Sequence, residues 1–237
     1  MSINHTKNII EIKNVSLAYD KEPVLKNINL NIHEGDYLGI IGPNGGGKTT
    51  LIKIILGLIK PTTGIVTLKT QQLGYVPQKV TNFDVNFPIT VKEVVAQGRI
   101  AQRGLFHNLD KEDWKIVEKS LATVELLDQQ NKLLSQLSVG QQQRVFIARA
   151  ISASHPHVIF LDEPTSGIDQ HSQKHFYSFL KHLNRDLGIT LVLISHDVDI
   201  ITHEVSHVAL VNQKLEYYGD PKLFIEKHYL SHHQHDS

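Results

Sequence analysis

A glycine-rich stretch at residues 42–50, GPNGGGKTT, has the composition of a phosphate-binding loop. Gly42, Gly47, Lys48 and Thr49 fit the spacing G-x4-G-K-[ST], with an apolar run before the loop and a helical pattern after it. Glycines let backbone N–H groups converge on phosphate oxygens, the lysine reaches the β- and γ-phosphates, and the threonine hydroxyl binds Mg²⁺. The complete pattern disfavours the alternative of a plain glycine turn. The predicted nucleotide-binding residues here are Gly42, Pro43, Asn44, Gly45, Gly46, Gly47, Lys48, Thr49 and Thr50.

Two acidic residues end the apolar run VIFLDEP at 158–164. A strand in this position would place Asp162 and Glu163 at the carboxyl edge of a parallel sheet, where open α/β sheets bind ligands. Because neighbours on a strand point to opposite sides, the two carboxylates can have separate roles. We expect Asp162 to hold Mg²⁺ and Glu163 to polarise the water that attacks the γ-phosphate. Two solvated acids in a turn before Pro164 are the alternative, which the phosphate loop disfavours.

A third motif, LSVGQQQR at 137–144, contains Ser138 and Gly140 at the expected start of a helix. Such a start can bind an anion through its free backbone N–H groups. Taken alone, the motif is better explained as an ordinary serine-capped helix. A second phosphate-binding helix start in one chain, however, requires a ligand of its own.

The elements that must position these motifs alternate between strands and helices. Residues 9–20 and 24–36 alternate apolar and polar positions, and 37–42 is an almost continuous apolar run. Further strands are expected at 64–69, 73–77, 157–164, 189–195, 205–211 and 214–219. Leu51, Ile54, Ile55 and Leu58 form one face of a helix, which Gly57 weakens and Pro61 helps to end.

The region from about 90 to 152 has a helical pattern without a strand-like run. One stripe there consists of Trp114, Val117, Leu121 and Val124, and a later, longer helix carries Phe176, Phe179, Leu180, Leu183 and Leu187. Strands that alternate with helices predict a parallel α/β sheet, and the middle block predicts a helical lobe inserted into it. We therefore expect one nucleotide-binding unit with a lobe.

Composition excludes several classes of protein. The chain has 237 residues, with 24 basic and 24 acidic side chains, so nothing favours a nucleic-acid partner. It has no cysteine, which excludes disulfides and cysteine metal sites. The first residues lack the apolar stretch of a signal peptide, and the longest apolar stretch, 51–59, is broken by Lys53. We expect a soluble, cytoplasmic chain.

Together the three motifs resemble the ATP-binding cassette (ABC) ATPases, over about residues 9–225. The resemblance implies an α/β fold: a P-loop NTPase core with a mainly parallel sheet, an antiparallel β subdomain and an inserted α-helical lobe. It implies a single domain over 1–237. The core would comprise 1–78 and 153–225, the lobe with the signature motif 79–152, and a histidine-rich tail 226–237.

In that family the signature LSGGQ completes the ATP site of a partner subunit. The present LSVGQ departs from it at Val139. The resemblance places Ser138, Gly140 and Gln141 at the nucleotide, so the site should survive the change. Because a β-branched residue tolerates positive φ poorly, we predict ordinary backbone angles at Val139.

Four further positions match the family one at a time. Gln78 is similar to the loop glutamine that binds near Mg²⁺ and links core to lobe, and His196 to the switch histidine. Asp169, in SGID, is similar to the residue that crosses the dimer interface, and Tyr19 to the aromatic that stacks on adenine. The alternative for Gln78 is a surface amide, that for His196 is a structural histidine, and that for Tyr19 is a core tyrosine.

The resemblance also implies a mechanism. Two chains would close head to tail around two MgATP, each phosphate loop facing the other's LSVGQ, and hydrolysis would open them. Glu163 would be the general base, with His196 and Lys48 as the other catalytic residues. The pair would sit at the cytoplasmic face of the inner membrane and drive a separate permease.

Residues 78–99 resemble the corresponding segment of the zinc/manganese-uptake ABC ATPases. We therefore expect an importer of a divalent transition metal, zinc first and manganese next, served by an extracytoplasmic metal-binding protein. Candidate permease contacts are Phe83, Phe87, Val91 and Val94, which alternatively only pack the lobe. An exporter, an importer of another solute and a soluble ABC protein of translation or DNA repair stay open. A small-molecule kinase is disfavoured by LSVGQ and His196.

The chain contains 15 histidines and ends in HYLSHHQHDS. His228, His232, His233 and His235 would bind a transition metal if the tail served as a metal sensor. A solvated tail is the simpler interpretation.

Overall fold

The computed structural model describes residues 7–20, 22–78, 88–103 and 108–228. By their contacts the residues divide into two compact units, Met1–Gln71 with Asn184–Ser237, and Gln72–Leu183. This division follows compactness alone, so the predicted lobe boundaries at 79 and 152 stay a prediction. Within the described residues, no helix has the length and apolar character needed to cross a membrane.

The first unit contains an antiparallel sheet built on two long strands. In this sheet β1 (Asn8–Tyr19) lies between β2 (Glu22–His33) and β4 (Thr63–Leu68). Apolar side chains alternate into the core, as at Ile10 and Ile12, because successive strand residues point to opposite faces. The predicted antiparallel β subdomain is confirmed.

A second group of strands in the same unit carries the phosphate loop. The short strand β3 (Tyr37–Ile41) lies between β7 (Thr190–Ile194) and β8 (His207–Asn212), parallel to both, and β9 (Lys214–Gly219) pairs antiparallel with β8. All five residues of β3 and of β7 are buried. These are the continuous apolar runs expected of parallel strands. The helices of this unit are α1 (Lys48–Ile55), α6 (Val198–Glu204) and α7 (Pro221–His228).

Helix α1 ends earlier than the sequence pattern predicted. Its last residue is Ile55, and Gly57 adopts φ 72°, the left-handed conformation that commonly terminates helices. Leu58 consequently lies outside the helix and is 64% exposed. The assignment of Leu58 to the buried face was wrong because Gly57 stops the helix instead of merely weakening it.

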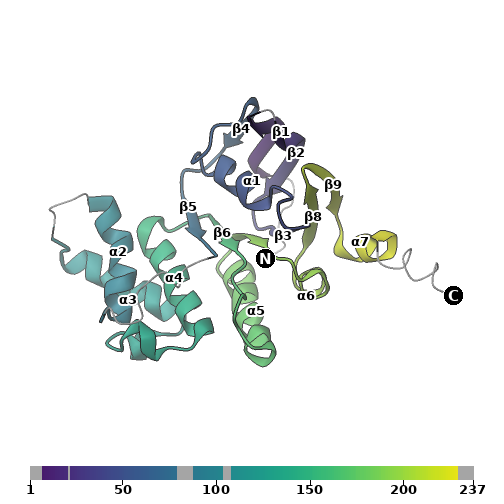
Figure 1. Cartoon of the computed structure of the whole chain (residues 1–237). Coiled ribbons are helices and arrows are strands. Elements are labelled where there is room, and N and C mark those ends of the chain that lie inside the picture. The colour runs from purple at the N-terminus through teal and green to yellow at the C-terminus, as the bar shows by residue number, and fades with distance from the viewer. Residues whose placement is uncertain (1–6, 21, 79–87, 104–107, 229–237) are drawn as a thin grey trace. The chain divides into compact units, whose positions relative to one another are not determined.

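The second unit joins two strands to a group of helices. Strands β5 (Leu73–Val76) and β6 (Val158–Asp162) pair in parallel, and α5 (Gln170–Arg185) follows β6. Helices α2 (Val91–Arg103), α3 (Lys111–Thr123) and α4 (Val139–Ser154) pack against one another (Figure 1), with short 3₁₀ turns at Leu127–Gln129 and Leu134–Gln136. A Cβ added at Gly98 of α2 would lie 2.4 Å from the Arg149 carbonyl oxygen, so glycine permits this close approach to α4.

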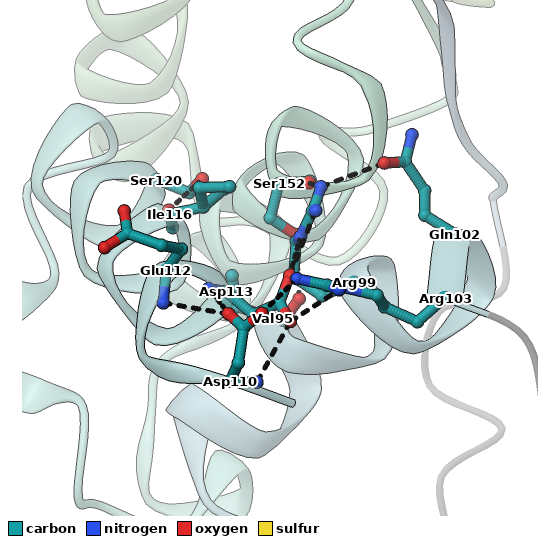
Figure 2. Close-up of polar contacts among 10 residues, drawn as sticks. All are labelled: Val95, Arg99, Gln102, Arg103, Asp110, Glu112, Asp113, Ile116, Ser120 and Ser152. Carbon is teal, nitrogen blue, oxygen red and sulfur yellow. Dashed lines mark hydrogen bonds and ion pairs between the residues drawn. The ribbon is translucent and has the colours of Figure 1, made fainter. Parts of the chain in front are cut away.

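A buried ion-pair network fastens α2 to α3 (Figure 2). The Asp113 carboxylate is fully buried and lies 3.0 Å from both the Arg99 and the Arg103 guanidinium nitrogens. Burial opposes its charge, but the Asp110 backbone N–H and the two guanidinium groups outweigh it, so the pKa of Asp113 is below its usual value. Asp110 in turn caps α3 by accepting from the backbone N–H groups of Glu112 and Asp113. Sequence reasoning missed this network.

Four apolar positions differ from expectation. Trp114 lies in α3 with Val117 and Leu121, as expected, but is 38% exposed. Leu187 lies beyond the end of α5 and is exposed, so it does not belong to the helix to which it was assigned. Val91 and Val94 are fully buried, which makes them lobe packing and not permease contacts. The other two candidate contacts, Phe83 and Phe87, fall outside the described residues.

Candidate functional site

In the phosphate loop between β3 and α1, close packing leaves little room for a side chain at Gly42 and Gly47. Gly42 has φ 142°, and a Cβ there would lie 2.1 Å from the Val211 carbonyl oxygen. Gly47 has φ 94°, and its Cβ would lie 2.5 Å from Leu25 Cδ2. Gly45 also has positive φ but faces open space. The chain's own packing therefore holds the loop in shape.

Lys48 is buried, with 6% exposure, and points its ammonium into this loop. Its Nζ donates hydrogen bonds to the Gly42 and Pro43 carbonyl oxygens, each at 2.8 Å. Gly47 is the N-cap of α1, and no side chain caps this helix start. A helix N-terminus without a side-chain cap, beside a buried ammonium, fits a phosphate group. Thr49 and Thr50 lie half-buried in the first turn of α1, and Asn44 is exposed in the loop.

Two other predicted residues lie in the first unit. Tyr19 ends β1 and is 53% exposed, which rules out the alternative of a core tyrosine. His196 is exposed just beyond β7 and precedes α6. Asp197 caps α6 by accepting a hydrogen bond from the Ile200 backbone N–H at 3.1 Å. The cap fixes the end of the loop that carries His196.

In the second unit, Asp162 ends β6 and is buried. The Tyr75 hydroxyl on the neighbouring strand β5 donates to its Oδ2 at 3.5 Å. Burial, and next the Asp162 charge, raise the pKa of Tyr75 to about 12, so this phenol stays a donor. A buried carboxylate of this kind is well suited to bind a divalent cation, because the cation compensates the lost hydration. Sequence reasoning missed Tyr75, although it stands three residues before Gln78.

Glu163 lies just beyond β6 in an uncommon conformation. Its φ is 47°, a left-handed value that costs a non-glycine residue roughly 1–2 kcal/mol. Strand alternation therefore does not separate Asp162 from Glu163; the turn does. The Gln78 amide Nε2 donates a hydrogen bond to the Glu163 carboxylate, so two residues that the sequence singled out independently are in contact.

The signature motif forms the start of α4. Ser138 Oγ accepts from the Gln141 backbone N–H at 3.3 Å, and the Gln141 side chain accepts from the Ser138 N–H at 3.0 Å, which makes a capping box. Val139 is the first residue of α4 and has ordinary helical backbone angles, as predicted. A Cβ at Gly140 would meet nothing closer than Ile168, at 3.7 Å. The chain itself therefore does not require glycine at 140.

Beside this helix start is a hollow of about 230 Å³, here called the signature hollow. Its lining residues are Glu125, Leu126, Gln129, Ser138, Gly140, Gln141, Arg144, Ser172, His175 and Phe176. The Arg144 guanidinium pairs with the Glu125 carboxylate at 2.8 Å and lies 4.4 Å from the centre of the Phe179 ring. The ring and the carboxylate hold this cation in place in the wall of the hollow.

Asp169 is exposed at the start of α5. Its Oδ1 accepts from the Ser172 backbone N–H at 3.0 Å, and hydrogen bonding to Ser172 lowers the pKa of Asp169. It is thus a helix cap, whatever other contact it makes. Of the tail histidines, His228 is the last residue of α7, and the other three, His232, His233 and His235, fall outside the described residues.

Comparison with known proteins gives a consistent result. The ABC transporter family profile matches residues 25–166. The zinc uptake system ATP-binding protein ZurA of Listeria monocytogenes is 42% identical over 95% of this chain and 90% of its own length. The manganese transport system ATP-binding protein MntB of Halalkalibacterium halodurans is 38% identical, over 89% of this chain and 86% of its own.

Solved structures agree with the sequence matches. A metal-chelate type ABC transporter in an inward-facing conformation has a TM-score of 0.82 at 28% identity, over 92% of this chain and 85% of its own. A dimeric bacterial ABC transporter cassette has a TM-score of 0.72 at 31% identity, and the match covers 90% of this chain and 98% of the cassette. The chain therefore belongs to the ABC transporter family, as an ATP-hydrolysing ATP-binding protein similar to those named for zinc and manganese uptake.

Proposed function

We propose that this chain powers an importer of a divalent transition metal, zinc first and manganese next, through a separate membrane permease. The observation that carries the proposal is the 42% identity to a zinc uptake ATP-binding protein over 95% of the chain. A high-affinity zinc uptake ATP-binding protein, ZnuC of Bacillus subtilis, is 41% identical over 80% of the chain. The identity to MntB keeps manganese as the second candidate.

In this proposal the phosphate loop holds the nucleotide phosphates. Lys48 exchanges its hydrogen bonds to the Gly42 and Pro43 carbonyls for bonds to the β- and γ-phosphates, since its ammonium is already buried at the loop. Tyr19, exposed at the end of β1, stacks on the adenine ring. Thr49, Asp162 and Gln78 are the proposed Mg²⁺ ligands. Mg²⁺, when bound, offsets the negative charge of the phosphate oxygens.

Glu163 is the proposed general base. A water oxygen attacks the γ-phosphorus while the bond from that phosphorus to the ADP oxygen breaks, and the Glu163 carboxylate takes the proton that the water loses. The hydrogen bond from Gln78 orients this carboxylate. His196 is proposed to contact the γ-phosphate from the loop after β7.

The proposed active form is a head-to-tail dimer. Ser138, Gly140 and Gln141 of one chain complete the ATP site of the other, and Asp169 crosses the interface. The room around Gly140 supports this role, because its missing side chain serves no packing need within the chain. A phosphate that approaches the backbone at Gly140 would require a residue without a side chain. The dimeric cassette at 31% identity supports a dimer.

The remaining parts of the proposal concern the membrane. The lobe at 79–152 receives the permease at the cytoplasmic face of the inner membrane, and an extracytoplasmic protein delivers the metal. No nucleic-acid partner is proposed, since basic and acidic side chains are equal in number.

Whole-cell metal content under metal limitation tests the substrate. Cells with the wild-type chain are compared with cells carrying Glu163→Gln, at matched protein levels, by mass spectrometry. We expect zinc to fall selectively in the variant. A fall in manganese alone would replace zinc as the substrate, and unchanged metal content would reject metal import.

A further inference from the structure

The first turns of α5 carry two histidines on one face, His171 and His175. Residues four apart on a helix are neighbours, and both side chains are exposed. Their ring centres lie 5.0 Å apart and the ring planes meet at 63°. The pair is separate from the residues assigned to nucleotide chemistry.

This distance matches two imidazoles that share one metal ion. A Zn–N bond is about 2.0–2.1 Å, and the ring centre lies about 1.1 Å farther, so each centre would be about 3.2 Å from the ion. Two such rings at angles of about 90–109° have centres about 4.5–5.2 Å apart. The observed 5.0 Å lies in this interval.

We propose that His171 and His175 bind a divalent transition-metal ion of the zinc, nickel and copper class. Within the described part of the chain, no group of three histidine, cysteine or acidic side chains is placed to hold a metal. Two carboxylates of this region are engaged, Asp169 in capping α5 and Glu125 in its ion pair with Arg144. Water therefore completes the coordination, and the affinity follows the order in which Cu²⁺ exceeds Ni²⁺ and Zn²⁺.

The position of the pair gives it a consequence. His175 also lines the signature hollow, together with Ser138, Gly140 and Gln141. A hydrated ion on His175 adds bulk and charge at the edge of the surface that, in the proposed dimer, closes on the other chain's nucleotide. Bound metal should therefore slow ATP turnover. This consequence rests on the proposed function, whereas the metal site itself does not.

Binding is measured first, with Cu²⁺ and Ni²⁺ by calorimetry on the full chain. All proteins carry His232→Ala, His233→Ala and His235→Ala, which removes most of the tail background. His171→Ala and His175→Ala are compared with the matched control His182→Ala, an exposed histidine farther along α5. Removal of a residue that only hydrogen-bonds to a metal ligand already lowers metal affinity by about 10–100-fold. Removal of His171 or His175, each a proposed ligand, should lower the affinity at least as much.

The control should bind one equivalent as tightly as the parent protein, and Cu²⁺ electron paramagnetic resonance should show two equatorial nitrogens. Unchanged affinity in either single variant would overturn the site, as would an equal loss in His182→Ala. Thermal melts verify that all variants are folded.

The ATPase arm then uses Zn²⁺ with saturating MgATP. We expect Zn²⁺ to inhibit the parent protein and to spare His171→Ala. Equal inhibition of both would reject the link to the signature hollow while binding stands. A parent protein without ATPase activity would instead reject the proposed function, since metal binding is measured without nucleotide.

Discussion

The side-chain amide of Gln78 donates a hydrogen bond to the carboxylate of Glu163, across 85 positions of sequence. The two residues come from the ends of the paired strands β5 and β6. The contact places the proposed Mg²⁺-binding amide on the proposed general base.

Glu163→Gln should leave ATP binding intact and lower turnover by about 10²–10⁴-fold, because the amide cannot accept the proton from water. The substitution keeps the size of the side chain and an oxygen that can accept from Gln78. Single-turnover phosphate release and equilibrium ATP binding measure the two effects. Hydrolysis at the wild-type rate would remove Glu163 from its role.

Gln78→Ala should slow turnover by up to about 10²-fold, since the base loses the partner that orients it. If the amide acts through Glu163, the double variant Gln78→Ala/Glu163→Gln should be no slower than Glu163→Gln alone. Rates of the four proteins form the test. Multiplied losses in the double variant would mean that Gln78 acts independently.

The left-handed backbone of Glu163 predicts that replacing this residue by glycine stabilises the fold relative to replacing it by alanine. Because its φ is 47°, Glu163→Gly should be more stable than Glu163→Ala by about 1 kcal/mol, the left-handed strain of a side chain. Both variants should be inactive. Denaturant unfolding compares the two, and an alanine variant of equal or greater stability would show that the turn does not store this strain.

Two glycines of the second unit should respond differently to alanine. Gly140→Ala should melt like wild type, since the nearest atom would be 3.7 Å away, yet it should lose ATP-dependent dimerisation and turnover. Gly98→Ala should lower the melting temperature, since its Cβ would lie 2.4 Å from a backbone oxygen. Thermal melts measure the stability of each variant, and light scattering with ATP measures its dimerisation. A destabilised Gly140→Ala would mean that glycine 140 serves the fold.

The cap on α5 should be sensitive to pH. The pKa of Asp169 is lowered in the folded chain, so its carboxylate stabilises the fold above the unfolded value near 3.8 and ceases to do so as pH falls through the folded value. Asp169→Ala should therefore melt below wild type at pH 7, and the difference in melting temperature should shrink as the pH falls below 3.8 and through the lower folded pKa of Asp169. Asp169→Asn, which can still cap, is the control. A difference independent of pH would contradict the ionic cap.

The sequence was most informative where short-range chemistry determines structure. The phosphate loop, the capped start of α4 and the buried runs of β3 and β7 each depend on residues within a few positions of one another. Val139 could be predicted for the same reason, because a β-branched side chain limits its own backbone. The match of β9 to residues 214–219 follows from simple alternation.

Features that depend on distant residues were not predictable. The end of α1 at Ile55 and the exposure of Leu58 result from the conformation that Gly57 adopts, which its residue type permits but does not fix. The ion pairs from Asp113 to Arg99 and Arg103 need two helices to be packed first. The left-handed turn at Glu163 is visible only in the folded chain.

The phosphate loop is held from two sides by contacts within the chain. Lys48 bonds to the carbonyls of Gly42 and Pro43, and the Gln213 backbone N–H donates to the Gly46 carbonyl at 2.9 Å. These bonds order the loop as the chain folds, which lowers the conformational entropy that remains to be lost when ATP binds. We therefore expect nucleotide to meet a loop that the fold has already shaped, so that discrimination between ATP and ADP falls to the residues that meet the γ-phosphate.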